Sequence, residues 1–220
     1  MFSSRISRGK YNPIEEAMKY LRIKEKRTIV ISFTSDPYPF KETVAKITRR
    51  VLEVLSKAKQ HRILILTKNP VAAIRDIDIM LSHGDMWLGT TITTLDDDAA
   101  EKIETHAPLP YMRTSALKFA HRKGVKTWLS IEPIIPYVTL PEEIVEQTID
   151  YVDWYVLGAY NYYNKLRLPK VNRYIPDGGR FTRRELTAWY NLHVPRAIKL
   201  LKEYNKSFFV KKELKKYLGD

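Results

Sequence analysis

Short apolar runs alternate with stretches of helical periodicity along most of the chain. Five apolar runs lie at 29–33, 63–66, 87–89, 128–131 and 154–158, and each ends in a polar cluster. Between them, apolar residues recur every three or four positions, most clearly over 41–57. Asn12-Pro13 and Asn69-Pro70 mark helix starts, since each joins a capping side chain to a first-turn proline. This alternation predicts parallel strands with right-handed crossovers.

The strands have the pattern of a barrel rather than of an open nucleotide-binding sheet. Several are apolar on both faces, as covered parallel strands should be. No Gly-x-Gly-x-x-Gly follows any strand, and polar residues end every strand instead of gathering at one switch point. We therefore predict an α/β fold: a partial (β/α) TIM-like barrel of about five to six parallel strands.

We expect a single domain over residues 1–220. Its barrel core would span about 12–161, and 162–220 would hold a loop, a helix kinked or split at Pro195, a strand at 207–210 and a basic tail. No apolar run approaches the length of a membrane span, and the basic N-terminal segment lacks the apolar stretch of a signal peptide. We expect no membrane association and a cytoplasmic protein.

Polar side chains follow the first two strands, where α/β folds collect their chemistry. Ser35 and Asp36 precede a Pro-Tyr-Pro turn and could hold an ammonium group or ribose hydroxyls, although a carboxylate here is also explained as a turn cap. Lys68 could pair with a ligand carboxylate or phosphate, or form a Schiff base. A lysine that extends to the rim of the barrel explains it equally.

The later strands end in hydroxyl, carboxylate and amide groups. Thr91 and Thr93 alternate with an isoleucine and so face one side, either the barrel interior or the helices. Glu132 follows a buried strand, and a buried carboxylate needs a partner, which favours a role in a site. Tyr160 and Asn161 could recognise or stack on an adenine.

The charge of the chain favours a polyanionic partner. Thirty-eight Lys and Arg against 25 Asp and Glu give a net charge of +13 and a pI near 9.7. A thermophile-like basic surface would give the same number. A basic, tyrosine-rich loop follows residue 161, and its mixture suits phosphate contact and base stacking, unless its tyrosines pack on the barrel rim. The candidate nucleic-acid contacts are Tyr162, Tyr163, Lys165, Arg167, Lys170 and Arg173.

The chain contains no cysteine. Disulfides and thiolate-bound metals are therefore excluded within these 220 residues. The five histidines show no metal-ligand spacing, and no Walker loop, Gly-x-Ser-x-Gly or His-Glu-x-x-His occurs. We expect no metal site.

Several segments together resemble the radical SAM superfamily, in the branch of spore photoproduct lyase and the DNA-repair-photolyase-like proteins. The resemblance covers about 12–161 and is most distinctive over 88–136. The segments that carry it read ISFTSDPYPFKETVAKITRRVLEVL, ILILTKNP, AAIRDIDIM, LGTTITTLDDDAAEKIETHAPLPYMRTSALKFAHRKGVKTWLSIEPIIP and VLGAYNYY.

The resemblance implies residue roles around S-adenosylmethionine. Ser35 and Asp36 would match a strand tip near its amino group, and Lys68 would match a lysine near its carboxylate. Thr91, with Thr93 beside it, would offer a hydroxyl on the family's fourth strand. The remaining implied contacts are Glu132 on the fifth strand, and Tyr160 and Asn161 on the sixth, towards adenine.

The chain departs from this family at its first strand. That strand leads into a Cys-x-x-x-Cys-x-x-Cys loop that holds an iron–sulfur cluster, and this chain begins about where the family has passed its third cysteine. We expect a chain that is truncated or cluster-less, and inactive in radical chemistry as it stands. Without the first strand the barrel would expose an edge that a partner chain or a dimer would cover.

Three functions remain open at this point. The first is a radical-SAM-type, DNA-repair-like protein resembling spore photoproduct lyase, a lyase by resemblance alone. The second is a non-catalytic barrel that binds nucleic acid, which the net charge favours. The third is a barrel lyase that uses Lys68 as a Schiff base, with Glu132 as acid or base.

Overall fold

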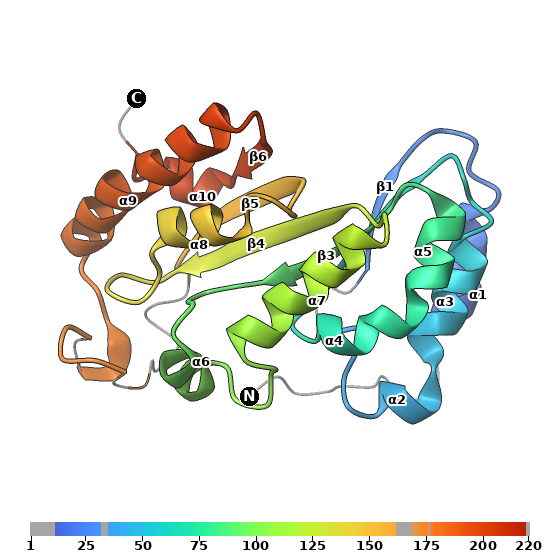
Figure 1. The fold of residues 1–220 in the computed structure, drawn as a ribbon, viewed down its shortest axis with the longest axis horizontal. Coiled ribbons are helices and arrows are strands. Elements are labelled where there is room, and N and C mark those ends of the chain that lie inside the picture. Colours follow the sequence, from blue (N-terminus) through green and yellow to red (C-terminus); the bar gives the residue numbers. More distant parts are fainter. Residues whose placement is uncertain (1–11, 32–34, 162–168, 170, 176, 219–220) are drawn as a thin grey trace. The chain divides into compact units, whose positions relative to one another are not determined.

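The strands form one parallel sheet in the order of the sequence. The computed structural model describes residues 12–31, 35–161, 169, 171–175 and 177–218. Six strands pair in the order β1-β2-β3-β4-β5-β6, with helices in the crossovers (Figure 1). The predicted α/β partial TIM-like barrel is thereby confirmed. The strands are β1 (Thr28–Ile31), β2 (Arg62–Thr67), β3 (Met86–Thr91), β4 (Thr127–Ile134), β5 (Trp154–Ala159) and β6 (Ser207–Val210).

At least one helix lies between each pair of consecutive strands. The helices are α1 (Pro13–Tyr20), α2 (Glu42–Ala45), α3 (Ile47–Leu55), α4 (Pro70–Ala73), α5 (Ile77–His83), α6 (Asp97–Ile103), α7 (Pro110–Arg122), α8 (Pro141–Thr148), α9 (Arg183–Glu203) and α10 (Lys212–Lys215), with 3₁₀ turns at Ile74–Asp76 and Asp177–Gly179. In the part of the chain that the structure describes, none of them is both long and apolar enough to cross a membrane.

The chain divides into two compact units. The first comprises Met1–Thr90 and Ala116–Thr127, and the second comprises Thr91–Ser115 and Trp128–Asp220. The expectation of a single domain stays a prediction.

The first unit packs apolar strands against α1, α3 and α5 (Figure 1). Ile63 and Ile65 of β2 and Leu52 of α3 are completely buried. The helix starts form as the sequence predicts. The side chain of Asn12 accepts a hydrogen bond from the Ile14 amide at the start of α1, and that of Asn69 accepts one from the Ala72 amide at the start of α4. Both caps satisfy amides that a helix leaves unpaired.

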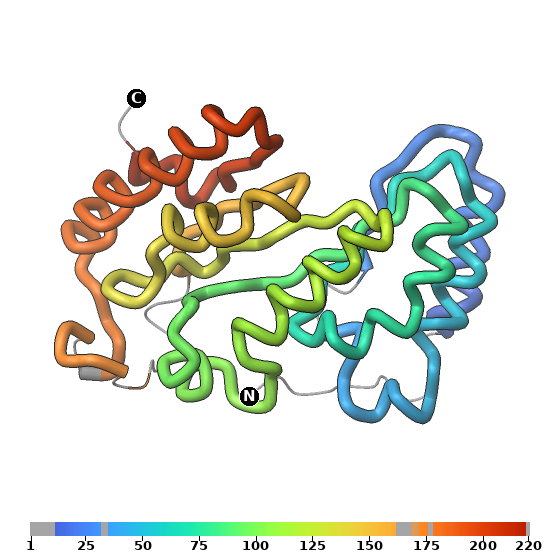
Figure 2. Tube along the Cα trace, viewed as in Figure 1, coloured from blue at the N-terminus to red at the C-terminus, as the bar shows by residue number. Residues whose placement is uncertain are grey.

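The second unit holds β4, β5 and β6 with α8, α9 and α10, and α8 lies alongside α9 (Figures 1 and 2). Thr182 and Glu185 form a capping box that begins α9. This helix continues through Pro195, so the proline does not split it. The predicted strand at Ser207–Val210 is present and pairs parallel to β5.

Among the described strands, β1 pairs with β2 alone. This edge is where the sequence predicts a missing strand. Its cover by a partner chain or a dimer stays a prediction.

Candidate functional site

Asp36 ties the end of β1 to the end of β2 in the first unit. Its Oδ1 accepts hydrogen bonds from the Tyr38 amide at 2.8 Å and from the Thr67 hydroxyl at 2.6 Å. Its Oδ2 accepts one from the Lys68 amide at 2.7 Å. The carboxylate therefore caps the turn, which is one of the two interpretations that the sequence allowed. It also fixes the backbone of Lys68 through the hydrogen bond to its amide. Ser35 beside it is exposed.

Lys68 directly follows the carboxyl end of β2 and is partly buried. Its neighbour Thr67, which sequence reasoning missed, is buried, and its hydroxyl oxygen accepts a hydrogen bond from the Asn69 amide at 2.8 Å. The tip of β2 is thus fixed by side chains of its own turn. The ligand and Schiff-base roles of Lys68 stay predictions.

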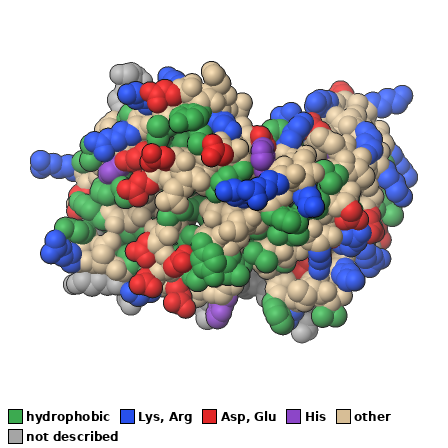
Figure 3. All heavy atoms as spheres, viewed as in Figure 1, with side chains coloured by type: hydrophobic (Ala, Val, Ile, Leu, Met, Phe, Trp, Pro, Cys, Tyr) green, Lys and Arg blue, Asp and Glu red, His purple; other side chains and the backbone are tan. Residues whose placement is uncertain are grey.

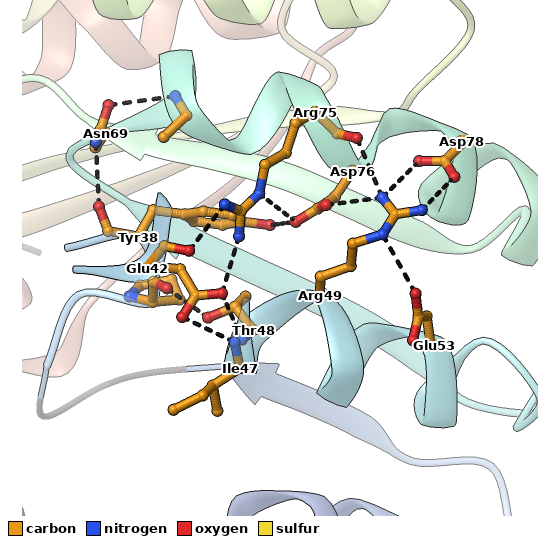
Figure 4. Close-up of polar contacts among 12 residues, drawn as sticks. Tyr38, Glu42, Ile47, Thr48, Arg49, Glu53, Asn69, Arg75, Asp76 and Asp78 are labelled. Atoms are coloured by element: carbon orange, nitrogen blue, oxygen red, sulfur yellow. Dashed lines mark hydrogen bonds and ion pairs between the residues drawn. The ribbon is translucent and has the colours of Figure 1, made fainter. Parts of the chain in front are cut away.

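A buried ionic network holds the segment after β1 in place (Figure 4). The hydroxyl of Tyr38 donates to Oδ2 of the fully buried Asp76 at 2.9 Å, and Arg49 pairs with Oδ1 of the same carboxylate at 2.9 Å. Burial, and next the charge of Asp76, raise the pKa of Tyr38 far above its usual range. Arg75 pairs with Glu42 at 2.8 Å.

The local sequence carries no signal for this network. Arg49 and Asp76 are 27 positions apart, and each alone reads as an ordinary surface charge on a helix. Only the packing of α3 against the segment after β2 makes them partners.

In the second unit, the backbone after β3 is fixed by a buried arginine. Arg113 is almost completely buried and donates to the carbonyl of Thr91 at 3.0 Å and to Glu104 at 2.6 Å. Thr91 and Thr93 are both buried. The hydroxyl of Thr93, a residue only 1% exposed, has no hydrogen-bond partner among the described residues. Sequence reasoning missed Arg113, which lies inside a helix.

Glu132 reaches across β5 to a lysine that follows β6. The β4–β5 register shifts between Ile131 and Ile134, so Glu132 lies in an irregularity of its strand. Its Oε2 pairs with Nζ of Lys211 at 2.5 Å, and the two side chains are 24% and 30% exposed. Gly158 makes room for the carboxylate, because a Cβ there would lie 2.5 Å from the Cδ of Glu132.

Sequence reasoning singled out Glu132 but not Lys211 or Gly158. Lys211 stood in a basic tail with no apparent role, and the partner carboxylate lies 79 positions away. The glycine in the strand was the available signal, since glycine inside a strand often marks a close approach by another group.

Tyr160 directly follows β5 in the second unit. Its amide donates to the Tyr190 hydroxyl at 2.9 Å, and that hydroxyl donates to the carbonyl of Ile134 at 3.1 Å. Tyr160 is only 3% exposed, its own hydroxyl has no partner in the described part of the chain, and burial raises its pKa. Asn161 is partly exposed.

Most of the predicted nucleic-acid contacts lie outside the described residues, namely Tyr162, Tyr163, Lys165, Arg167 and Lys170. Arg173 is described and exposed, and its guanidinium lies 4.9 Å from the centre of the Tyr174 ring. Nucleic-acid binding by this segment stays a prediction.

The residues present do not suit an iron–sulfur cluster. The chain has no cysteine. Within the described ranges, no group of three or more His, Asp or Glu side chains could hold a metal ion. These residues therefore offer no thiolate that could ligate such a cluster.

No family model matches this sequence. Uncharacterized protein MJ0683 of Methanocaldococcus jannaschii is 30% identical over 148 residues, which are 67% of this chain and 55% of that protein. Uncharacterized protein ORF301 of Acidianus two-tailed virus is 28% identical over 134 residues, which are 60% of this chain and 44% of that protein. The chain thus spans about half the length of these relatives.

Solved structures resemble this one over most of its length. Spore photoproduct lyase complexed with dinucleoside spore photoproduct matches with a TM-score of 0.58 at 15% identity, over 90% of this chain and 64% of that chain. SuiB of Streptococcus suis bound to S-adenosylmethionine matches with a TM-score of 0.57 at 15% identity, over 90% of this chain and 43% of that one. The predicted resemblance to the spore photoproduct lyase branch is confirmed in the fold, which this chain shares with both of these proteins.

Proposed function

We propose that this chain is a partial barrel of the radical SAM type that binds S-adenosylmethionine at the carboxyl ends of its strands, and that it does not cleave this ligand reductively as it stands. The shared fold supports the proposal, as do bound ligands in two neighbours. SuiB was solved bound to S-adenosylmethionine, and one spore photoproduct lyase variant with bound AdoMet.

Two buried hydroxyls without partners carry the proposal. Thr93 follows β3 and Tyr160 follows β5, and neither hydroxyl has a hydrogen-bond partner among the described residues. Burying an unsatisfied polar group costs about 1–3 kcal/mol, so native structures keep few of them. A ligand that offers polar atoms at these strand ends would remove that cost. Both residues stand where strand-end chemistry is expected in this fold.

Asn161, which follows Tyr160 in the second unit, has matching chemistry, because its side-chain amide suits the edge of an adenine. When bound, S-adenosylmethionine supplies an adenosyl group on a sulfonium centre. The chain would bind and orient this group, while reductive cleavage requires an electron donor that its cysteine-free sequence cannot ligate.

Replacing Thr93 by valine separates a ligand hydroxyl from a structural one. In the free protein, T93V should leave the free energy of unfolding unchanged or raise it by about 1 kcal/mol, because the substitution removes an unsatisfied buried hydroxyl. The same variant should weaken S-adenosylmethionine binding, measured by isothermal titration calorimetry, about five- to tenfold.

Thr139 provides the matched control. It is also buried, but its hydroxyl accepts from the Ile135 amide at 2.9 Å. T139V should therefore lower stability, by about 1–3 kcal/mol. Wild-type protein that binds neither S-adenosylmethionine nor S-adenosylhomocysteine would overturn the proposed function. If T93V bound S-adenosylmethionine with unchanged affinity, Thr93 would not be part of the binding site.

A further inference from the structure

Four positions form one row across the carboxyl ends of the strands in the second unit. They are Thr93 after β3, Glu132 in β4, Gly158 in β5 and Lys211 after β6. The Ile92 amide donates to the Ser130 carbonyl at 3.0 Å, so the parallel register places Thr93 beside Glu132. The Lys211 amide donates to the Leu157 carbonyl at 2.9 Å, which places Lys211 beside Gly158 in the same way. Residues paired in a parallel sheet point to the same face, so these four positions share one face.

The row holds two opposite charges side by side. Nζ of Lys211 donates to Oε2 of Glu132 at 2.5 Å, in the space that Gly158 leaves open. The side chains of Glu132 and Lys211 are 24% and 30% exposed, so a ligand can reach both. A carboxylate has a second oxygen and an ammonium group has three N–H donors. Each group can therefore take a further partner without breaking the pair.

Thr93 supplies the observation that points to a ligand in this row. The residue is 1% exposed, and its hydroxyl has no hydrogen-bond partner among the described residues. It lies on the strand next to that of Glu132, at a strand spacing of about 4.8 Å. A polar group that entered the row would give this hydroxyl the partner it lacks and would at the same time reach the ion pair.

We propose that Glu132 and Lys211 bind the amino acid end of S-adenosylmethionine, with Glu132 accepting from its ammonium group and Lys211 donating to its carboxylate. The inference rests on the proposed function and names the part of the ligand that this row recognises. An anion alone would be repelled by Glu132 and a cation alone by Lys211, whereas a zwitterion meets an opposite charge at each residue.

The surroundings support recognition by individual groups. Acidic and basic side chains are interspersed over the second unit on the face that Figure 3 shows, so the local pair decides recognition more than a field of one sign. Asp36, which the resemblance implies for the ligand amino group, already accepts hydrogen bonds from the Tyr38 amide, the Thr67 hydroxyl and the Lys68 amide. Its carboxylate therefore has less capacity left for a ligand ammonium group.

Isothermal titration calorimetry with two uncharged thioethers tests the proposal. S-adenosylhomocysteine and 5′-methylthioadenosine share the adenosyl thioether, and only the first has the amino acid end. Wild-type protein should bind S-adenosylhomocysteine at least about tenfold more tightly, because its charged end makes two charge-assisted hydrogen bonds. The double variant E132Q/K211M leaves neither charge unpaired. It should lose most of this preference while its affinity for 5′-methylthioadenosine stays unchanged.

Single variants separate the two contacts. K211M should weaken binding of S-adenosylhomocysteine about tenfold, but not binding of its decarboxylated form, which keeps the ammonium group. E132Q should weaken binding of both. K212M is the matched control, because it removes the same charge from the exposed neighbouring lysine, and it should change neither affinity.

Three outcomes would overturn this assignment. They are equal affinity of the wild type for S-adenosylhomocysteine and 5′-methylthioadenosine, the same loss in K212M as in K211M, and a parallel loss of both ligands in the double variant. The last result would mean that the pair only supports the fold. A wild-type protein that binds none of these adenosyl ligands would instead overturn the proposed function itself, so the two failures are distinguishable.

Discussion

Single residues in the second unit fix the polar groups at the ends of its strands. Glu132 lies over Gly158 because no side chain fills that space, and its Oε2 then reaches Lys211. Such a partly buried pair is costly to break from one side, since the remaining charge keeps little of its hydration. The glycine therefore decides where this carboxylate lies.

Replacing Gly158 by alanine should displace Glu132. The added Cβ would lie 2.7 Å from the carboxylate Oε1, closer than real contacts allow. We expect G158A to lower the free energy of unfolding by about 1–3 kcal/mol, measured by denaturant titration.

A double-mutant cycle identifies the cause. With Glu132 already replaced by alanine, G158A should cost much less, because the group it clashes with is gone. An equal cost in both backgrounds would show that the glycine is needed for its backbone and not for the room it gives to Glu132.

Whole elements are joined by buried polar groups in the first unit. Asp76 and Arg49 tie α3 to the segment after β2, and His83 ties the end of α5 to residue 58. Nδ1 of His83 accepts from the Asp85 amide at 3.2 Å, and Nε2 lies 3.2 Å from the carbonyl of Ala58. This arrangement requires the neutral imidazole with its proton on Nε2.

The buried histidine makes stability depend on pH. Burial lowers the pKa of His83 below its ordinary value near 6.5. As the pH falls through 6.5, the unfolded chain takes up a proton that the folded chain refuses, so the contribution of His83 is complete above 6.5 and is lost on acidification towards its folded pKa.

The variant H83Q should remove this part of the pH dependence. We expect the difference in the free energy of unfolding between wild type and H83Q, measured from pH 8 down to about pH 5, to shrink below pH 6.5. The exposed His106 has a positive φ, so H106N is the suitable control and should leave the pH profile unchanged. A difference that stays constant with pH would contradict the assignment.

The whole molecule has the fold of spore photoproduct lyase without a thiolate for a cluster. It also spans about two thirds of that enzyme and about half the length of the relatives from Methanocaldococcus jannaschii and Acidianus two-tailed virus. This chain therefore has polar residues at its strand ends but no cysteine ligands for a cluster. Ligand binding and radical chemistry can be tested apart.

Reconstitution of the purified chain with iron and sulfide should give no iron–sulfur absorbance and, with dithionite and S-adenosylmethionine, no 5′-deoxyadenosine. Spore photoproduct lyase carried through the same procedure is the positive control. Formation of 5′-deoxyadenosine by this chain would contradict the proposed loss of reductive cleavage, and calorimetry would still report separately whether the ligand binds.

The sequence by itself determined the elements and their order. Apolar runs and capped helix starts such as Asn69-Pro70 are local signals, so the alternating strands and the partial barrel followed from them. The positions of the polar strand ends followed for the same reason. The absence of cysteine was also readable at once, because it depends on composition alone.

Only the tertiary structure decided which of these groups have partners. Asp36 is engaged by the turn and by β2, whereas the hydroxyls of Thr93 and Tyr160 are left without a partner among the described residues. Lys211 meets Glu132 across 79 positions of the sequence. Contacts between distant segments depend on how the strands and helices pack, and no local pattern of residues encodes that packing.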